Sequence, residues 1–124
     1  MPTGNLVIQI TSTLLMVVPQ EAAKAVMSVS VDGRGVGGRQ ASSMKTQKDE
    51  SGNVLNVTYY WKGAVIRMSN LTTGNHRVTV SLLVSGNGVS KSRTAWSGTV
   101  YVGENATASV VLQGGFGDTL QRAQ

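Results

Sequence analysis

The sequence contains no cysteine and a single histidine, His76. Without cysteine the chain has no disulfide bond, no thiolate metal site and no cysteine nucleophile. One histidine cannot build a triad or a zinc site without nearby partners, and the 6 acidic residues are scattered along the chain. We therefore expect that the protein is not an enzyme and holds no metal and no other cofactor. His76 falls on the apolar phase of its segment and is predicted to be a core or rim residue.

Charged residues are also few, at 14% of the chain against 40% hydrophobic residues. A disordered chain shows the opposite balance, and 124 residues suit one domain. The net charge of +5 comes from lysines and arginines that form no basic run. This pattern predicts a soluble basic surface and argues against a nucleic-acid partner.

Long uninterrupted hydrophobic segments are missing. The most apolar stretch, residues 6–18, has no basic residue before it and is broken by Gln9 and by Thr11, Ser12 and Thr13. It is therefore predicted to form strand and not a signal peptide. We expect no transmembrane segment, and an export signal, if one exists, would lie outside this sequence.

What the sequence has in abundance is the two-residue alternation of half-buried strands. Apolar residues recur at every second position in segments that end at Gly, Asn or Pro, namely residues 6–11, 14–18, 27–31, 55–61, 66–68, 78–84, 96–102 and 108–112. No amphipathic helix separates them. We predict an all-β, antiparallel immunoglobulin-like β-sandwich of 7–8 strands over residues 1–113, and a linker-like or disordered tail over residues 114–124.

The polar stretch from Gly33 to Asn53 interrupts this pattern. Only a short edge strand near Ser42–Gln47 is expected within it. The stretch opens with Gly33–Gly38, which satisfies G-x-G-x-x-G, but no helical apolar stripe follows to complete a dinucleotide site. A flexible glycine loop is the preferred interpretation.

Two segments carry a resemblance to a known group of domains. Residues 66–80, Ile-Arg-Met-Ser-Asn-Leu-Thr-Thr-Gly-Asn-His-Arg-Val-Thr-Val, resemble the strand–turn–strand segment of bacterial immunoglobulin-like and carboxypeptidase-regulatory-like domains. Residues 97–112 are similar to the terminal hairpin of such domains, and residues 4–8 and 22–31 resemble the opening strands of modules in bacterial surface lipoproteins. His76 stands where the family pattern has an aromatic residue, and the Gly33–Asn53 stretch has no counterpart. The resemblance implies a stalk, spacer, adhesion or glycan-contact module in the cell envelope or outside the cell.

Strand phase suggests one candidate recognition surface. If the segments 54–61, 77–84 and 91–102 are sheet neighbours, their outward faces combine tyrosines with cations. Aromatic rings beside cations on a rigid sheet suit stacking on sugars and contact with anionic groups. The predicted ligand-binding residues are Tyr60, Arg77, Lys91, Arg93 and Tyr101.

We therefore expect a non-catalytic cell-envelope or extracellular interaction or spacer module of a larger surface protein. Two alternatives stay open: a glycan- or polyanion-binding module that uses the basic and aromatic sheet face, and a structural protein of a virion tail or decoration. Other protein domains or surface glycans are the expected partners. Self-association through an exposed edge strand, such as Leu6 to Val18, is a further possibility.

Overall fold

The computed structural model describes residues 2–114 and 120–123 and consists of β-strands joined by turns. Within these residues there are 11 strands: β1 (Thr3–Ile10), β2 (Leu14–Val18), β3 (Lys24–Val31), β4 (Arg34–Gln40), β5 (Ser43–Lys48), β6 (Val54–Trp61), β7 (Ala64–Thr72), β8 (Gly74–Gly86), β9 (Val89–Val102), β10 (Thr107–Gly114) and β11 (Leu120–Arg122). In this part of the chain no helix has the length and apolar character needed to cross a membrane. The predicted all-β class is confirmed.

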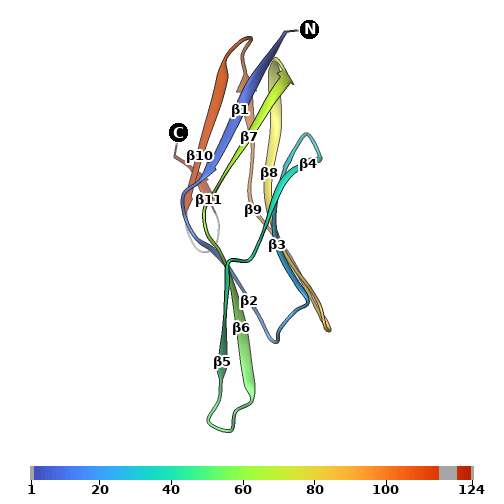
Figure 1. Cartoon of the computed structure of the whole chain (residues 1–124), viewed down its shortest axis with the longest axis vertical. Coiled ribbons are helices and arrows are strands. Elements are labelled where there is room, and N and C mark those ends of the chain that lie inside the picture. Colours follow the sequence, from blue (N-terminus) through green and yellow to red (C-terminus); the bar gives the residue numbers. More distant parts are fainter. Residues whose placement is uncertain (1, 115–119, 124) are drawn as a thin grey trace.

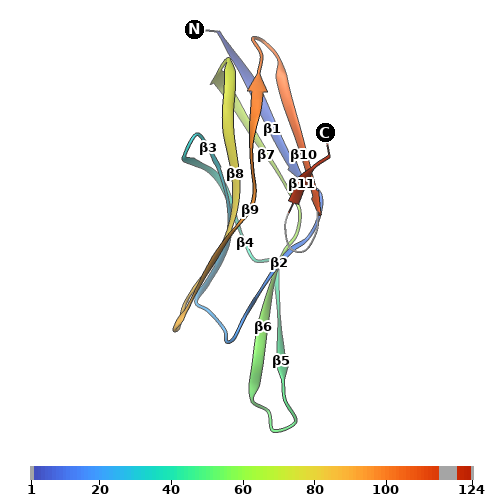
Figure 2. The ribbon, with the colours of Figure 1, turned by 180° about the vertical axis from the view of Figure 1, so that it is seen from behind.

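The strands form three sheets in two layers (Figures 1 and 2). Sheet A has the order β11-β10-β1-β7, sheet B has the order β2-β6-β5, and sheet C has the order β4-β3-β8-β9. Sheets A and B follow one another along the same layer, because β1 leads into β2 and β6 leads into β7. Sheet C forms the second layer, and the two layers together make a β-sandwich.

Close backbone approach explains one break between these sheets. Gly63 lies between β6 and β7, and a Cβ atom there would stand 2.1 Å from the carbonyl oxygen of Ile10. Only glycine fits so near to another backbone. The passage of the chain from β6 in sheet B to β7 in sheet A, next to the end of β1, therefore depends on this residue.

The first strand lies inside its sheet and not at an edge. β1 pairs antiparallel with β7, from Thr3↔Thr72 to Ile10↔Ala64, and parallel with β10, from Asn5↔Thr107 to Ile10↔Leu112. The expectation of purely antiparallel sheets is therefore wrong for sheet A. A parallel pair arises because the chain passes through β8 and β9 in the other layer before β10 returns beside β1.

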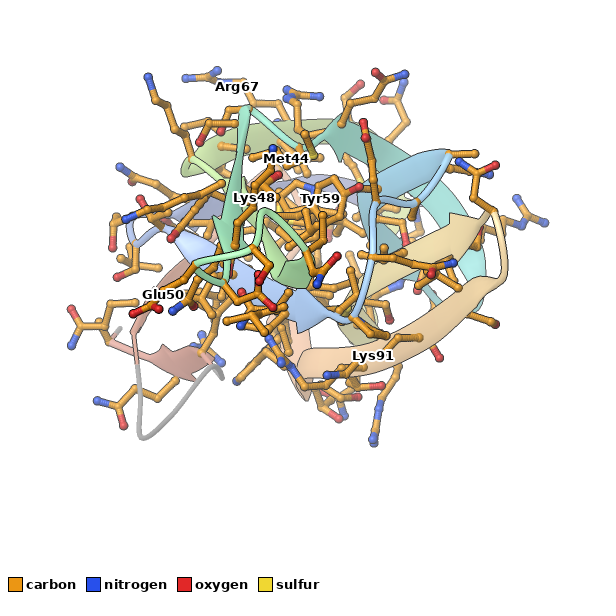
Figure 3. All side chains as sticks on the ribbon, turned by 90° about the horizontal axis from the view of Figure 1, so that it is seen from below. Met44, Lys48, Glu50, Tyr59, Arg67 and Lys91 are labelled. Atoms are coloured by element: carbon orange, nitrogen blue, oxygen red, sulfur yellow. The ribbon has the colours of Figure 1, made fainter. Side chains whose placement is uncertain are left out.

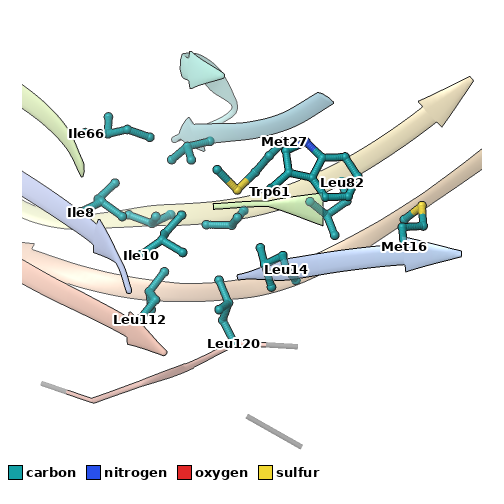
Figure 4. Packing of buried hydrophobic residues seen from close by; sticks show 14 of the residues in the cluster. Ile8, Ile10, Leu14, Met16, Met27, Trp61, Ile66, Leu82, Leu112 and Leu120 are labelled. Atoms are coloured by element: carbon teal, nitrogen blue, oxygen red, sulfur yellow. The ribbon is translucent and has the colours of Figure 1, made fainter. Parts of the chain in front are cut away.

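The core follows the predicted alternation. Leu6, Ile8 and Ile10 of β1 and Val78, Val80 and Leu82 of β8 belong to one buried cluster, and each is at most 2% exposed. Figure 4 shows residues of β1, β2, β3, β6, β7 and β10 meeting in one cluster, with Trp61 packed beside Met27 and Leu82. Such alternating burial fixes the register, because a slip of one residue would turn every apolar side chain to solvent.

Three predicted details differ from the structure. The strand count is higher than 7–8, since 11 strands occur among the described residues. The Gly33–Asn53 stretch holds two strands: β5 (Ser43–Lys48) was predicted as the edge strand near Ser42–Gln47, whereas β4 (Arg34–Gln40) replaces the expected glycine loop. The glycines of β4 hide it from an apolar pattern, and at Gly37 a Cβ would press on Ile66 at 3.1 Å.

The third difference concerns the tail predicted for residues 114–124. Residues 115–119 and 124 lie outside the described residues, but Leu120–Arg122 form β11 and pair with β10. Leu120 is 5% exposed and packs near Leu112 (Figure 4). A single apolar side chain, too isolated to create a periodic signal, anchors this strand.

Candidate functional site

The outer face of sheet C is lined with hydroxyl groups. Strand pairing aligns Ser28, Ser81 and Thr94 in one row across β3, β8 and β9. The next row contains Ser30, Thr79 and Ser97. Two further rows across β8 and β9 hold Arg77 with Thr99 and Asn75 with Tyr101. We call this surface the hydroxyl face; it comprises Ser28, Ser30, Asn75, Arg77, Thr79, Ser81, Thr94, Ser97, Thr99 and Tyr101.

Two of the predicted ligand-binding residues lie on the hydroxyl face. Arg77 is exposed, and its Nε donates to the Ser97 hydroxyl at 2.9 Å, while the hydroxyls of Ser97 and Thr79 are 3.3 Å apart. Tyr101 is 66% exposed and occupies the adjacent row, diagonal to Arg77. The arginine is thus held in one orientation beside an accessible aromatic ring.

Lys91 and Arg93, also predicted for this surface, point to the opposite side of the sheet. Their pairing partners, Val84 and Leu82, are fully buried, so the two cations belong to the inner phase of β9. The cause is a β-bulge: Val80 pairs with Trp96 and Ser81 with Thr94, which leaves Ala95 as one extra residue. An extra residue reverses the alternation of faces along a strand. The odd-numbered residues of β9 after Ala95 therefore face outward, whereas those before it face inward.

The inward-turned cations reach the free edge of β2. Lys91 Nζ donates to the carbonyl oxygen of Val17 at 3.0 Å, and Arg93 Nη2 donates to the carbonyl oxygen of Leu15 at 3.0 Å. They therefore cap an edge strand and join the two layers. The predicted edge for self-association, Leu6 to Val18, is closed along β1 by strand pairing on both sides and along β2 by these side chains.

Tyr60, the fifth predicted residue, lies in sheet B. It pairs with Leu15 of β2 and Ser43 of β5, and β6 is not a neighbour of β8 or β9. The structure thus brings together Arg77 and Tyr101 of the predicted set and separates the other three residues from them.

A second polar cluster surrounds His76 at an open end of the sandwich. A cavity of about 430 Å³ is lined by Val31, Asp32, Arg34, Val36, Met68, Asn70, Leu71, Thr72 and His76. His76 Nδ1 lies 2.6 Å from Asp32 Oδ2, and His76 Nε2 lies 2.6 Å from the Thr72 carbonyl oxygen. A carbonyl and a carboxylate can only accept, so this geometry favours the imidazolium form of His76, in which both ring nitrogens donate.

Hydrogen bonding shifts the pKa values of both His76 and Asp32. The bond to the Thr72 carbonyl, followed by the bond to Asp32, raises the pKa of His76. The bond from the Arg77 backbone N–H, 2.9 Å from Asp32 Oδ1, lowers the pKa of Asp32, and the bond to His76 adds to this effect. Asp32 adopts a φ of 53° in the turn between β3 and β4, and the pair ties this turn to β8.

His76 was correctly predicted as a core or rim residue, since it is 6% exposed. Its partnership with Asp32 was missed, because 44 residues separate the two in sequence. The usable signal was the Asp32-Gly33 turn, because the Asp32 carboxylate bonds to His76 and to the Arg77 backbone N–H on the neighbouring strand β8.

The glycine motif has a structural explanation, and the Asp49 carboxylate has a structural role. Gly33 is part of the β3–β4 turn and the following glycines belong to β4, so a strand and not a helix follows the turn. Asp49 Oδ1 accepts the backbone N–H groups of Ser51 and Asn53 at 2.9 Å each, which closes the β5–β6 turn. Across residues 2–114 and 120–123, no three His, Asp or Glu side chains gather as a metal-binding group.

Comparison with known proteins gives one distant match. No protein-family model matches the chain, and no curated protein matches it. Among solved structures, a "putative cell adhesion protein" from Bacteroides fragilis is similar at 9% sequence identity and a TM-score of 0.38. The match covers 99% of this chain and 46% of that chain, so the chain spans about half the length of that protein.

Proposed function

We propose that this chain is a non-catalytic interaction module that binds acidic glycans through the hydroxyl face. One observation carries the proposal: Arg77, oriented by Ser97, stands beside the exposed ring of Tyr101 on a sheet surface otherwise covered by hydroxyl groups. The location that we propose, the cell envelope or the outside of the cell, rests on the sequence resemblance of residues 66–80 and 97–112 to bacterial surface modules. The immunoglobulin-like type of the sandwich is proposed on the same basis.

The chemistry of the hydroxyl face suits a sugar with a carboxylate or sulfate group. The bond to Ser97 uses Arg77 Nε, so the terminal guanidinium nitrogens can donate two parallel hydrogen bonds to a carboxylate. The Tyr101 ring offers an amphipathic surface for stacking. Hydroxyls of Ser30, Thr79 and Thr99 can both donate to and accept from sugar hydroxyls.

A non-catalytic role is supported by the state of His76. Its two ring nitrogens both lie 2.6 Å from acceptors of the protein itself, so neither is available to take a proton from a substrate. The ion pair with Asp32 serves to fix the β3–β4 turn against β8. The same pair positions Arg77, whose backbone N–H donates to Asp32.

The test is binding of the purified chain to a panel of acidic and neutral glycans at low and physiological salt. Acidic glycans should bind saturably, with affinity that falls as salt rises. Arg77→Ala and Tyr101→Ala should each weaken binding by roughly tenfold or more, which corresponds to about 1.4 kcal/mol. Arg67→Ala, an exposed arginine on β7, is the matched control and should bind as wild type does.

Three results would count against the proposal. Equal binding by Arg77→Ala and Arg67→Ala would mean that net charge, and not the hydroxyl face, attracts the glycan. Binding of neutral and acidic sugars alike would remove the role of the guanidinium. No binding at either salt would leave the chain as a spacer or an assembly subunit.

A further inference from the structure

The β5–β6 hairpin carries an uncapped strand edge. β5 is the last strand of sheet B, and all six of its residues are exposed. Figures 1 and 2 show β5 and the adjoining part of β6 extending beyond the lower ends of β3, β8 and β9. An edge strand turns the N–H and C=O groups of every second residue away from its sheet, where another strand can pair with them.

The opposite edge of the same sheet, on β2, is hydrogen-bonded by side chains. On β2, the carbonyl oxygens of Leu15 and Val17 are occupied by the Arg93 and Lys91 side chains. On β5, the side-chain bond found within the described residues runs inward, from Asn56 Nδ2 of β6 to Gln47 Oε1 at 3.2 Å. Sheet B is therefore capped on one side and open on the other.

Side chains next to the open edge provide both charge and apolar contact. On one face, an open groove of about 460 Å³ is lined by Lys45, Thr46, Gln47, Lys48, Asn56, Thr58 and Tyr60. Met44 is 43% exposed and pairs with Tyr59, and Leu55 near the hairpin tip is 52% exposed. Figure 3, seen from below, shows Met44 and Lys48 on this hairpin and Lys91 well apart on β9.

Charge decides which strand can occupy this edge. A second copy would place its own Lys45 and Lys48 beside the same two lysines, and like charges across a ladder are destabilising. The acidic residues Asp49 and Glu50 keep their charge but lie in the turn after β5 and not on the strand that forms the edge. Lys45 and Lys48 are three residues apart and therefore project from opposite faces of β5, so a strand with acidic residues three positions apart would place one beside each lysine.

We propose that β5 is a docking edge for an extended acidic polypeptide segment, which adds to sheet B as a fourth strand. Main-chain hydrogen bonds to β5 supply the binding, and Lys45 and Lys48 select acidic side chains. Met44 on β5 contacts an apolar residue on the corresponding face of the docked strand. This surface lies in a different sheet from the hydroxyl face and does not depend on the proposed glycan binding.

The experiment uses the full chain, labelled with ¹⁵N, and three synthetic peptides. The first peptide is a Val- and Thr-rich strand with two Glu residues three positions apart, the second replaces each Glu by Lys, and the third places Pro at its centre and keeps the acidic residues. The acidic peptide should bind saturably and shift amide resonances of β5 and β6. The Lys peptide should not bind, and the Pro peptide should bind at least tenfold more weakly because it cannot complete the ladder.

Charge reversal supplies the matched variants. Lys45→Glu/Lys48→Glu should lose the acidic peptide and gain the Lys peptide, whereas Lys24→Glu/Arg67→Glu, with the same change in net charge, should behave as wild type does. Circular dichroism checks that both variants fold. Equal loss in both variants, or full binding of the Pro peptide, would overturn the proposal in favour of nonspecific attraction. Concentration-dependent dimerisation through β5 in sedimentation would show that a second copy is the occupant.

Discussion

His76 and Asp32 form a hydrogen-bonded ion pair of 2.6 Å that joins β8 to the turn between β3 and β4. Because of this pair, the free energy of unfolding falls both when the pH rises and when the pH falls. The raised pKa of His76 means that its contribution is complete below about pH 6.5 and is lost as pH rises through the folded-state pKa. The lowered pKa of Asp32 means that its contribution is present above about pH 3.9 and is lost as pH falls through the folded-state pKa.

We predict that Asp32→Asn reduces the decline in stability on the alkaline side without abolishing it, because the bond to the Thr72 carbonyl, the larger cause of the raised His76 pKa, remains. Without the carboxylate, the His76 pKa falls and the pair no longer favours the charged imidazole. Urea unfolding at a series of pH values from about 4 to 9 measures the free energy of unfolding. Asp49→Asn is the control, because Asp49 contacts no histidine and the alkaline decline should persist in that variant. An unchanged alkaline decline in Asp32→Asn would show that the ion pair is not its source.

Arg93→Ala should lower the free energy of unfolding by about 1–3 kcal/mol, since a charged donor is removed from the Leu15 carbonyl. Arg39→Ala is the comparison, because Arg39 of β4 is exposed and its Nη1 donates to the carbonyl oxygen of the neighbouring Gly38. That control should change stability by less than about 0.5 kcal/mol. Equal unfolding midpoints for the two variants would mean that capping of β2 contributes nothing.

Leu120→Ala should destabilise the protein by about 2–4 kcal/mol, because the side chain is buried against the core near Leu112. Gln121→Ala, on the neighbouring exposed position of β11, should be nearly neutral. Thermal and urea unfolding of both variants make the comparison. If Leu120→Ala unfolds as wild type does, the assignment of β11 to the core is wrong.

Gly63→Ala should cost about 1–3 kcal/mol, because the new methyl group would collide with the carbonyl oxygen of Ile10. Gly35→Ala in β4 adds the same group where no atom lies within 4 Å, so it should be close to neutral. Differential scanning calorimetry of the two variants tests the contrast. Similar melting temperatures would contradict the tight crossing at Gly63.

The sequence allowed the all-β class and most of the core to be predicted, because alternation along β1, β3, β8 and β10 is regular. It could not reveal β4, whose glycines carry no periodic signal, or β11, which has one buried residue. Of the five residues predicted for the candidate surface, two lie on one face. Arg77 and Tyr101 share a face as predicted, but the extra residue Ala95 turned Lys91 and Arg93 inward, and the pairing of β6 with β2 removed Tyr60.

The central position of β1 determines when this protein can fold. Val7 pairs with Ser109 on one side and with Arg67 on the other, so both neighbours of the first strand come from much later in the chain. Closing such long loops costs entropy before any contact compensates for it, and topologies of this kind fold slowly. During synthesis the strands that pair with β1 are made late, first β7 and then β10. Until then the apolar side chains of Leu6, Ile8 and Ile10, which are buried in the folded protein, stay exposed. The interval before β10 arrives is therefore the period in which the nascent chain most needs protection from aggregation.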